Sequence, residues 1–314
     1  MRKLNLLNTN TITFEEGCDL YLLNCKQRNL REGTINHYKQ SYTQFEKFFD
    51  MDMPVDRFNQ ALYNSYVVYL RETLNNDISI NSYLRDLITT LHFLMREGYV
   101  NSFEMKAIKV DKSAIQTYTE TELRQLLQKP NVRRCNFTEY QCWVMTNFLL
   151  STAVRQRSLI HIRISDIDLD NAVVNIKVTK NRKPLIIPLN ATMVAILKEF
   201  LKYRQSKSPD DWLFCNAYGQ QLVKSTCYHA LYCYNKSRGV VTTGIHRYRH
   251  TFAKQWILSG GNVVALSRLL GHSSLNITQN YINLLVSDLT KQVEEINLLD
   301  KFSPQSKITM PKRR

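Results

Sequence analysis

The sequence lacks the cysteine pattern of a disulfide-stapled protein or of a zinc ribbon. It has seven cysteines, an odd number, and no two of them are spaced as a C-x-x-C pair. Disulfide frameworks use even numbers of cysteines and zinc ribbons use close pairs, so neither kind of protein is indicated. The scattered thiols are typical of a protein kept reduced in a cytoplasm.

Signals for a membrane or for secretion are missing too. No apolar run is long enough to span a bilayer. Residues 1–11 hold two cationic side chains but too few apolar residues for the hydrophobic region of a signal peptide. Repeats and low-complexity tracts are absent before residues 303–314, a polar and basic stretch that we predict to be a flexible tail.

Acidic side chains are scarce relative to basic ones. The 314 residues include 42 Lys and Arg against 27 Asp and Glu, which gives a formal net charge of +15. A hydrophobic content of 44% argues against disorder, and the length suffices for two domains. A folded and strongly basic protein points to a polyanionic partner, although a merely soluble basic surface would have the same composition.

The first hundred residues predict a small helical bundle. Thr13 and Glu16 form a capping box that opens the first helix. Three more helices are predicted from apolar residues at three- and four-residue spacing, over residues 34–49, 60–74 and 79–98. We predict a helical domain over residues 1–105, followed by a polar, cationic linker over 106–118, with a long surface loop as the alternative to a linker.

Residues 119–302 predict a second domain that is mainly helical with a small antiparallel sheet. A second capping box, Thr119 with Glu122, opens a helix over 120–128, and another helix is predicted over 138–152. Residues 172–178 and 185–189 alternate like strands and are joined by a polar turn over 179–183. Helices follow over 251–258 and 262–270, and a further helix beginning near residue 273 carries Tyr281.

Cationic residues and histidines are concentrated near the end of this domain. His246 and His250 have the spacing of a helical metal pair, but the glutamate of H-E-x-x-H is missing, and Arg247 and Arg249 add positive charge. Interleaved cations and histidines favour an anion, and a phosphate is the commonest anion that requires bidentate arginine contacts. We therefore predict neither a metal nor a cofactor at these residues.

Taken in order, these residues resemble the C-terminal signature of the tyrosine recombinase (phage integrase) family. That signature is H-x-x-R-H-T, then L-G-H-S, then a tyrosine further on. In this sequence it is formed by His246, Arg249, His250, Thr251, Leu270, Gly271, His272, Ser273 and Tyr281. Taken alone, Tyr281 lies between Ile277 and Leu285 on an apolar helical face, where a tyrosine is usually a core residue.

The resemblance also implies an earlier arginine in T-G-x-R. Arg155 matches this pattern, except that Ala153 replaces the glycine. Ser158 stands where the family usually has an acidic residue, so the support of the arginine is expected to differ. Without the resemblance, Arg155 would be interpreted as a helix-end arginine on carbonyls or solvent.

A lysine in a β-turn is the last element that the resemblance implies. Lys180 has the place of that catalytic lysine, ahead of the strand that ends in Pro188, and Lys183 is the alternative. Taken alone, either lysine would be a solvated turn residue.

The resemblance implies a two-domain DNA clamp with an N-terminal helical, SAM-like domain and a tyrosine-recombinase catalytic domain. The implied activity is site-specific cutting and rejoining of double-stranded DNA through a 3′-phosphotyrosyl intermediate, without metal, ATP or cofactor. The implied roles are Tyr281 as nucleophile, Arg155, Arg249 and His272 as phosphate ligands, His246 as base and Lys180 as acid.

The implied partners are paired core sites, three further copies of the chain in a homotetramer, and in some systems an accessory DNA-bending or directionality factor. A helix that Ser287 caps is expected to be donated to a neighbouring copy, with packing on its own domain as the alternative. We expect a cytoplasmic, nucleoid-associated enzyme without an extra N-terminal arm-binding domain that integrates and excises a mobile element. Chromosome or plasmid dimer resolution of the Xer type, a type IB topoisomerase and a catalytically inactive DNA-binding regulator are the alternatives.

Overall fold

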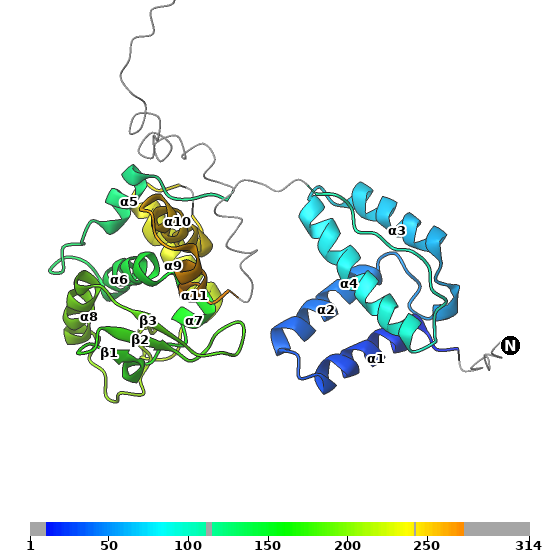
Figure 1. Ribbon diagram of the computed structural model, residues 1–314, viewed down its shortest axis with the longest axis horizontal. Helices are drawn as coiled ribbons and strands as arrows, with labels where there is room; N and C mark the ends of the chain where they lie inside the picture. The colour runs from blue at the N-terminus through cyan, green and yellow to red at the C-terminus, as the bar shows by residue number, and fades with distance from the viewer. Residues whose placement is uncertain (1–10, 111–114, 242, 273–314) are drawn as a thin grey trace, which may run out of the picture. The chain divides into compact units, whose positions relative to one another are not determined.

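The computed structural model describes residues 11–110, 115–241 and 243–272. The chain divides into two units, residues 1–113 and residues 114–314, and each unit has its own hydrophobic core (Figure 1). Ser273, Tyr281 and the helix expected from Ser287 lie outside the described residues. None of the helices in the described part of the chain has both the length and the apolar character that crossing a membrane requires.

The N-terminal unit is the helical bundle that the sequence predicts. Its capping box is present, because Thr13 Oγ1 accepts a hydrogen bond from the Glu16 amide at 3.2 Å and Glu16 Oε2 accepts one from the Thr13 amide at 2.8 Å. The helices are α1 (Phe14–Gln27), α2 (Glu32–Phe45), the short 3-10 helix η1 (Val55–Arg57), α3 (Gln60–Thr73) and α4 (Asp77–Arg96).

Helix α2 begins and ends earlier than the apolar spacing indicated. It begins at Glu32, two residues before Thr34, and it ends at Phe45 instead of Phe49. The spacing continues past the helix because Phe49 turns into the same core, where its ring centroid lies 5.4 Å from that of Phe14. Aromatic rings that pack edge to face are a large part of such a core. The three- and four-residue apolar spacing therefore indicated which residues are buried, and it did not indicate where the helix ends.

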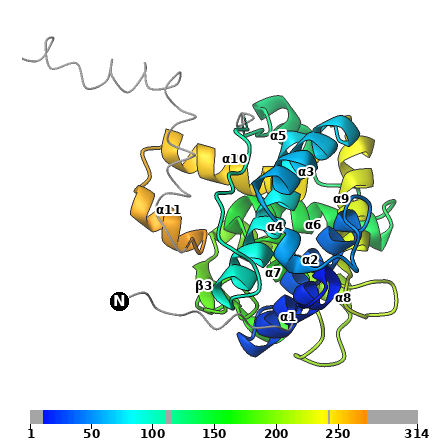
Figure 2. The ribbon, with the colours of Figure 1, turned by 90° about the vertical axis from the view of Figure 1, so that its right-hand side faces the viewer.

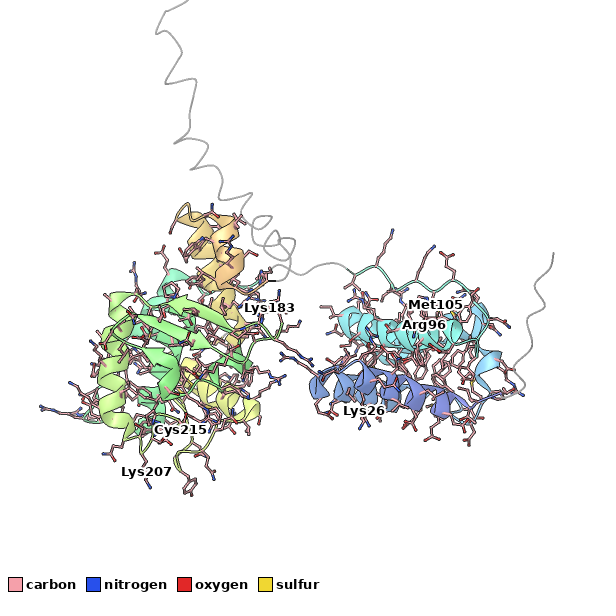
Figure 3. The ribbon with its side chains drawn as sticks, turned by 60° about the horizontal axis from the view of Figure 1, so that its bottom comes forward. Lys26, Arg96, Met105, Lys183, Lys207 and Cys215 are labelled. Atoms are coloured by element: carbon pink, nitrogen blue, oxygen red, sulfur yellow. The ribbon has the colours of Figure 1, made fainter. Side chains whose placement is uncertain are left out.

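The chain beyond α4 runs back along the bundle. The Tyr63 hydroxyl of α3 donates to the Lys106 carbonyl at 2.9 Å, and Asn81 Nδ2 of α4 donates to the Ile108 carbonyl at 3.1 Å. Met105 is buried in the bundle core and lies beside α4 in Figure 3. Residues 101–110 are therefore held on the N-terminal unit by side-chain hydrogen bonds and by burial.

The C-terminal unit is mainly helical with a three-stranded antiparallel sheet, which confirms the predicted fold class. The strand order is β1-β2-β3, and Val174 of β2 pairs with Ile167 on one side and Ile187 on the other. The elements are α5 (Glu120–Leu127), α6 (Phe137–Thr152), α7 (Gln156–Leu159), the 3-10 helix η2 (Ile164–Asp166), β1 (Ile167–Asp168), β2 (Val173–Ile176), β3 (Leu185–Pro188), α8 (Ala191–Arg204), α9 (Lys224–Ser237), α10 (Ile245–Leu258) and α11 (Val263–Leu269).

Helix α6 is the centre of this unit. It packs against α5, α8, α9 and α10, and residues on every side of it are buried. A helix with buried residues on every side needs such a position, because its burial is not confined to one stripe. Since α6 ends at Thr152, the segment with Arg155 directly follows the central helix of the domain.

Helix α10 is longer than the sequence indicated. It begins at Ile245 and not at Thr251, so His246, Arg249 and His250 are helical residues. The polar run before Thr251 disguised the helix start, because two of its arginines are buried by contacts with distant parts of the chain. After Gly260 and Gly261 the chain continues into α11, with Asn262 as the predicted N-cap, and α11 lies beside α10 (Figure 2).

Candidate active site

Arg155 owes its position to an unusual turn after α6. Ala153, at the end of α6, has a left-handed backbone with φ of 53°, and Arg155 then serves as the N-cap of α7. Glycine is the usual residue in this conformation, and alanine there costs about 1 kcal/mol. Ala153, which replaces the glycine of T-G-x-R, thus has the left-handed backbone that a glycine would favour. Arg155 Nη1 makes a long 3.4 Å hydrogen bond to the carbonyl of Leu270.

Arg249 is the buried arginine of the site. It projects from α10 and is only 5% exposed. Its Nη1 donates to the Ala153 carbonyl at 2.8 Å, and its Nη2 donates to the Leu270 carbonyl at 2.6 Å. A buried guanidinium is tolerated only when its donors are satisfied, so these carbonyls explain how a charged side chain is placed inside the domain.

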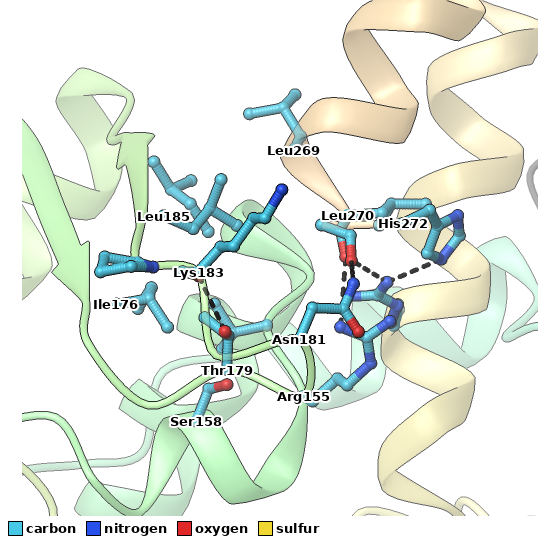
Figure 4. Close-up of a pocket in the computed structure, with 15 residues that line it drawn as sticks. Arg155, Ser158, Ile176, Thr179, Asn181, Lys183, Leu185, Leu269, Leu270 and His272 are labelled. Atoms are coloured by element: carbon cyan, nitrogen blue, oxygen red, sulfur yellow. Dashed lines mark hydrogen bonds between the residues drawn. The ribbon is translucent and has the colours of Figure 1, made fainter. Parts of the chain in front are cut away.

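The two arginines meet at the loop that follows α11. The Leu270 carbonyl accepts hydrogen bonds from both Arg155 and Arg249. Gly271 has φ of +58°, and its amide donates to Arg268, while the amide of His272 donates to Ser267. This is the left-handed turn that ends many helices, and it brings His272 to the arginines. Figure 4 shows Arg155 and His272 beside Leu270.

His272 is bonded directly to Arg249. Arg249 Nη2 lies 2.8 Å from His272 Nε2. A guanidinium only donates, so Nε2 is the acceptor and a neutral His272 carries its proton on Nδ1. Burial, followed by the charges of Arg249 and Arg155, lowers the pKa of His272 from 6.5 to about 4. The ring is therefore neutral at pH 7 and offers one N–H donor.

His246 lies in the electrostatic field of the same cations. Its pKa is lowered below 6.5, first by desolvation and then by the positive charges of Arg249, Arg155 and Lys180. The pKa of His250 is lowered to about 4, mainly by burial. His246 is neutral at pH 7 and is able to accept a proton. Among the described residues, no group of three or more His, Cys, Asp or Glu side chains is arranged to hold a metal ion.

The predicted turn between β2 and β3 faces this group. Lys180 is exposed on the turn, and its charge acts on His246. Lys183, the alternative lysine, lines a cavity of about 300 Å³ together with Arg155, Arg249 and His272. The turn therefore brings both lysines toward the arginines.

Two side chains outside the predicted site hold this turn in place by hydrogen bonds. Ser158, which replaces the expected acidic residue, donates from Oγ to the Val178 carbonyl at 2.7 Å. Asn181 Nδ2 donates to the Gly271 carbonyl at 3.2 Å. Sequence reasoning missed Asn181, and the only signal for it was a polar residue next to Lys180. Arg247 instead has a structural place, because it donates to Gln116 and lies over the Tyr118 ring.

The predicted nucleophile Tyr281 lies outside the described residues, so its place in the site stays a prediction. Two other tyrosines near the motifs are unsuited to the role. The Tyr234 hydroxyl donates to the Leu126 carbonyl and the Tyr248 hydroxyl donates to Asn235 Oδ1, and both side chains are buried. Burial raises the pKa of Tyr248 to about 12. Both hydroxyls therefore belong to the core.

The arrangement has the donors that a phosphate diester needs. Two guanidinium groups, a neutral imidazole with one N–H, a second neutral imidazole and lysines on a turn converge on one loop. Residues 116–287 match the phage integrase family, and residues 18–110 match the phage integrase SAM-like domain. The chain belongs to the phage integrase family. It is thus a tyrosine recombinase, a class that carries out site-specific DNA recombination.

Curated relatives agree with this family. The chain is 24% identical to tyrosine recombinase XerD of Staphylococcus saprophyticus over 282 residues, which cover 86% of this chain and 94% of that protein. It is 26% identical to tyrosine recombinase XerC of Leptospira interrogans over 265 residues, covering 82% of this chain and 85% of that protein. Similarity therefore extends over both units.

Solved structures share the fold. The Tn1549 transposon integrase in complex with a circular intermediate DNA has a TM-score of 0.70 at 21% identity, covering 87% of this chain and 95% of that chain. A lambda integrase dimer bound to a COC′ core site has a TM-score of 0.70 at 16% identity, covering 96% and 81%. The predicted SAM-like domain and catalytic domain are both confirmed by the family matches.

Proposed function

We propose that this recombinase cuts one DNA strand by attack of Tyr281 on a phosphodiester, forming a 3′-phosphotyrosyl bond and releasing a 5′ hydroxyl. The observation that supports this chemistry most is the meeting of Arg155 and Arg249 at the Leu270 carbonyl, beside His272. Exchange of one phosphoester for another conserves the energy of the bond, so the strand is rejoined by the reverse reaction.

The cationic side chains would stabilise the charge that builds up on phosphorus oxygens. Arg155 and Arg249 would bind the non-bridging oxygens, for which a planar guanidinium is suited. His272 would donate from Nδ1, since Nε2 already accepts from Arg249. Loss of one donor to such a transition state typically costs about 10²–10³ in rate.

Proton transfer would use His246 and Lys180. A tyrosine hydroxyl has a pKa near 10, so a base assists its attack, and the lowered pKa of His246 leaves that imidazole neutral and able to accept the proton. Lys180 would protonate the departing 5′ oxygen. These groups together supply charge and protons, so the proposed reaction uses neither a metal ion, nor ATP, nor a cofactor.

We further propose double-stranded DNA with paired core sites as the substrate, with contacts to the DNA from each unit. The net charge of +15 supports binding to a polyanion. The active assembly would be a homotetramer, in which the helix that we expect Ser287 to cap is donated between copies. An accessory DNA-bending or directionality factor would be an additional partner in some reactions. Such an enzyme would work at the nucleoid in the cytoplasm.

The biological role that we propose is integration and excision of a mobile element. Dimer resolution of the Xer type is the second candidate, because curated relatives include XerD and XerC while a transposon integrase shares the fold. The DNA next to the coding sequence distinguishes these roles, since a mobile element leaves attachment and excision junctions. A type IB topoisomerase would relax supercoils without a paired site.

A nicked suicide substrate carrying the core site tests the proposed function. Wild type is expected to accumulate a covalent protein–DNA complex, and Tyr281→Phe is expected to bind the same DNA without forming one. Tyr228→Phe and Tyr232→Phe are the controls, because these tyrosines of α9 also carry hydroxyls near the motifs in the sequence, and their loss should leave the covalent complex unchanged. A covalent complex with Tyr281→Phe would identify another nucleophile, and no complex with wild type would favour the regulator.

A further inference from the structure

The turn that carries Lys180 is tied to the loop that carries His272. Asn181, the next residue after Lys180, donates from Nδ2 to the Gly271 carbonyl at 3.2 Å. Asn181 and Gly271 are 90 positions apart in the sequence. Figure 4 shows Asn181 beside Leu270 and Arg155, at the cavity between the turn and the loop.

The other end of the turn is fixed to the body of the domain. Ser158, buried at the end of α7, donates to the Val178 carbonyl at 2.7 Å, where β2 has just ended. Thr179 Oγ1 donates to the Lys183 carbonyl at 2.7 Å and closes the turn on itself. The base of the turn is therefore set by α7, while Asn181 connects its tip to the His272 loop.

The Gly271 carbonyl, which accepts this hydrogen bond, lies in the chain between Leu270 and His272. Leu270, immediately before Gly271, accepts from both arginines, and His272 follows it. Gly271 has room around it, since an added Cβ would meet Leu185 at 3.6 Å and Arg155 at 4.0 Å. The hydrogen bond from Asn181 to this residue therefore fixes the lysine turn relative to the side chains that would bind the phosphate.

We propose that Asn181 is a positioning residue for Lys180. Lysine has a flexible four-carbon stem, and Lys180 is exposed, so its ammonium group covers a wide volume unless the backbone below it is held. General acid catalysis requires the acid within hydrogen-bond reach of the leaving oxygen. By docking the turn on the Gly271 carbonyl, Asn181 keeps Lys180 at the distance from the bound phosphate at which this transfer occurs.

The step that depends on Asn181 is the release of the 5′ oxygen. As Tyr281 forms its bond to phosphorus, the bond from phosphorus to the 5′ oxygen breaks, and Lys180 transfers a proton from Nζ to that oxygen and becomes neutral. This inference depends on the proposed function, in which Lys180 is the acid. It predicts a defect that disappears when the leaving group needs no proton.

A 5′-bridging phosphorothiolate provides that leaving group, because a departing thiolate is stable without protonation. Single-turnover cleavage of suicide substrates with a 5′ oxygen or a 5′ sulfur would be measured with the full chain. The variants are Asn181→Ala, and Asn181→Asp, which keeps the shape but has no donor at pH 7. The matched control is Asn171→Ala, which removes a similar hydrogen bond, Nδ2 to Asp168 Oδ2 at 2.7 Å, in the turn at the other end of β2.

Asn181→Ala and Asn181→Asp are expected to cleave the oxygen substrate about tenfold more slowly, which is a part of the roughly 10²–10⁴-fold acceleration that a general acid provides. Both variants should cleave the sulfur substrate at the wild-type rate, and Asn171→Ala should match wild type on both substrates. Melting temperature and DNA affinity are measured in parallel, and both should equal those of wild type.

Equal slowing of Asn181→Ala on the two substrates would overturn the inference, because it would indicate a defect in phosphate binding. Unchanged cleavage of the oxygen substrate would overturn it as well. Lys180→Ala on the same pair separates this result from the proposed function. If the sulfur substrate rescues Lys180→Ala and not the Asn181 variants, Lys180 is the acid without Asn181. If it does not rescue Lys180→Ala, the role of Lys180 itself fails.

Discussion

Arg249 donates to His272 across 2.8 Å, from Nη2 to Nε2, and this bond determines which nitrogen of the imidazole carries a proton. A neutral His272 is protonated on Nδ1. Because burial and the two arginines lower its pKa to about 4, the neutral ring persists well below pH 7. His272 therefore has one N–H group available as a donor while the ring is uncharged.

The pH dependence of stability follows from the same pKa values. Well above pH 6.5, His250 and His272 are neutral in both the folded and the unfolded chain. As pH falls from 6.5 toward 4, the unfolded chain takes up protons at His250 and His272 that the folded chain does not, so the free energy of unfolding decreases. Thermal melts from pH 7.5 to 5 should show this decrease, and His250→Gln should reduce its slope. An unchanged slope would contradict the buried, neutral state of His250.

The two lysines of the β2–β3 turn are expected to differ. Lys180→Ala should slow cleavage by about 10²-fold or more, and a 5′-bridging phosphorothiolate should restore it. Lys183→Ala should retain most activity, although Lys183 lines the cavity. Arg155→Ala should not be restored by sulfur, because its loss removes charge from the phosphate site. Rescue of Lys183→Ala in place of Lys180→Ala would exchange the roles of the two lysines.

Ionic conditions should affect binding and chemistry separately. Cleavage of bound DNA is expected to proceed equally in EDTA and without ATP, since protein side chains supply the proposed charge and protons. Affinity should fall by about 10³-fold or more between roughly 50 and 200 mM salt, as expected when several phosphates are neutralised. Titrations by fluorescence anisotropy and single-turnover cleavage would measure the two effects. A cleavage step that stops in EDTA would revive a metal site at His246 and His250.

A pair of glycines tests the loop before His272. Gly271→Ala and Gly260→Ala both place an alanine in a left-handed backbone, with φ of +58° and +75°, and each should cost about 1 kcal/mol of stability. Only Gly271→Ala should slow cleavage, because Leu270 and His272 flank that residue. Chemical denaturation and suicide-substrate cleavage measure the two quantities. Similar cleavage by both variants would show that the loop tolerates displacement.

The chain beyond Val286 is expected to matter for assembly. Truncation after Val286 should leave a folded protein that binds single sites and fails to form a tetramer on paired sites. Gel filtration with two-site DNA, and mixing with the full chain, would measure this. A truncated protein that still assembles and recombines would contradict donation between copies, whereas an unfolded one would favour packing on its own domain.

Local signals predicted where several helices begin, whereas the candidate site residues were predicted from the resemblance to a family. The capping boxes at Thr13 and Thr119 are present as predicted, because both partners lie within one helical turn. The start of α10 was predicted six residues too late, since Arg249 is satisfied by Ala153 and Leu270, far away in the sequence. Asn181 was missed for the same reason, because its acceptor is 90 residues distant. Pairings of this kind depend on the tertiary fold.

The carbonyl of Leu270 has a consequence for the ions that share a cell with this enzyme. At rest it accepts a hydrogen bond from Arg155 and one from Arg249, so an anion entering the cavity competes with this carbonyl for one nitrogen of each guanidinium. Free phosphate or a nucleotide makes that exchange without further support. A phosphate within a duplex differs from them, because the adjacent phosphates are also attracted to a chain of net charge +15. These adjacent phosphates hold it in place while the arginines change hydrogen-bond partners. We therefore expect selectivity for the polymer over its monomers to come from the neighbouring phosphates of the duplex, which hold the reacting phosphate at the site.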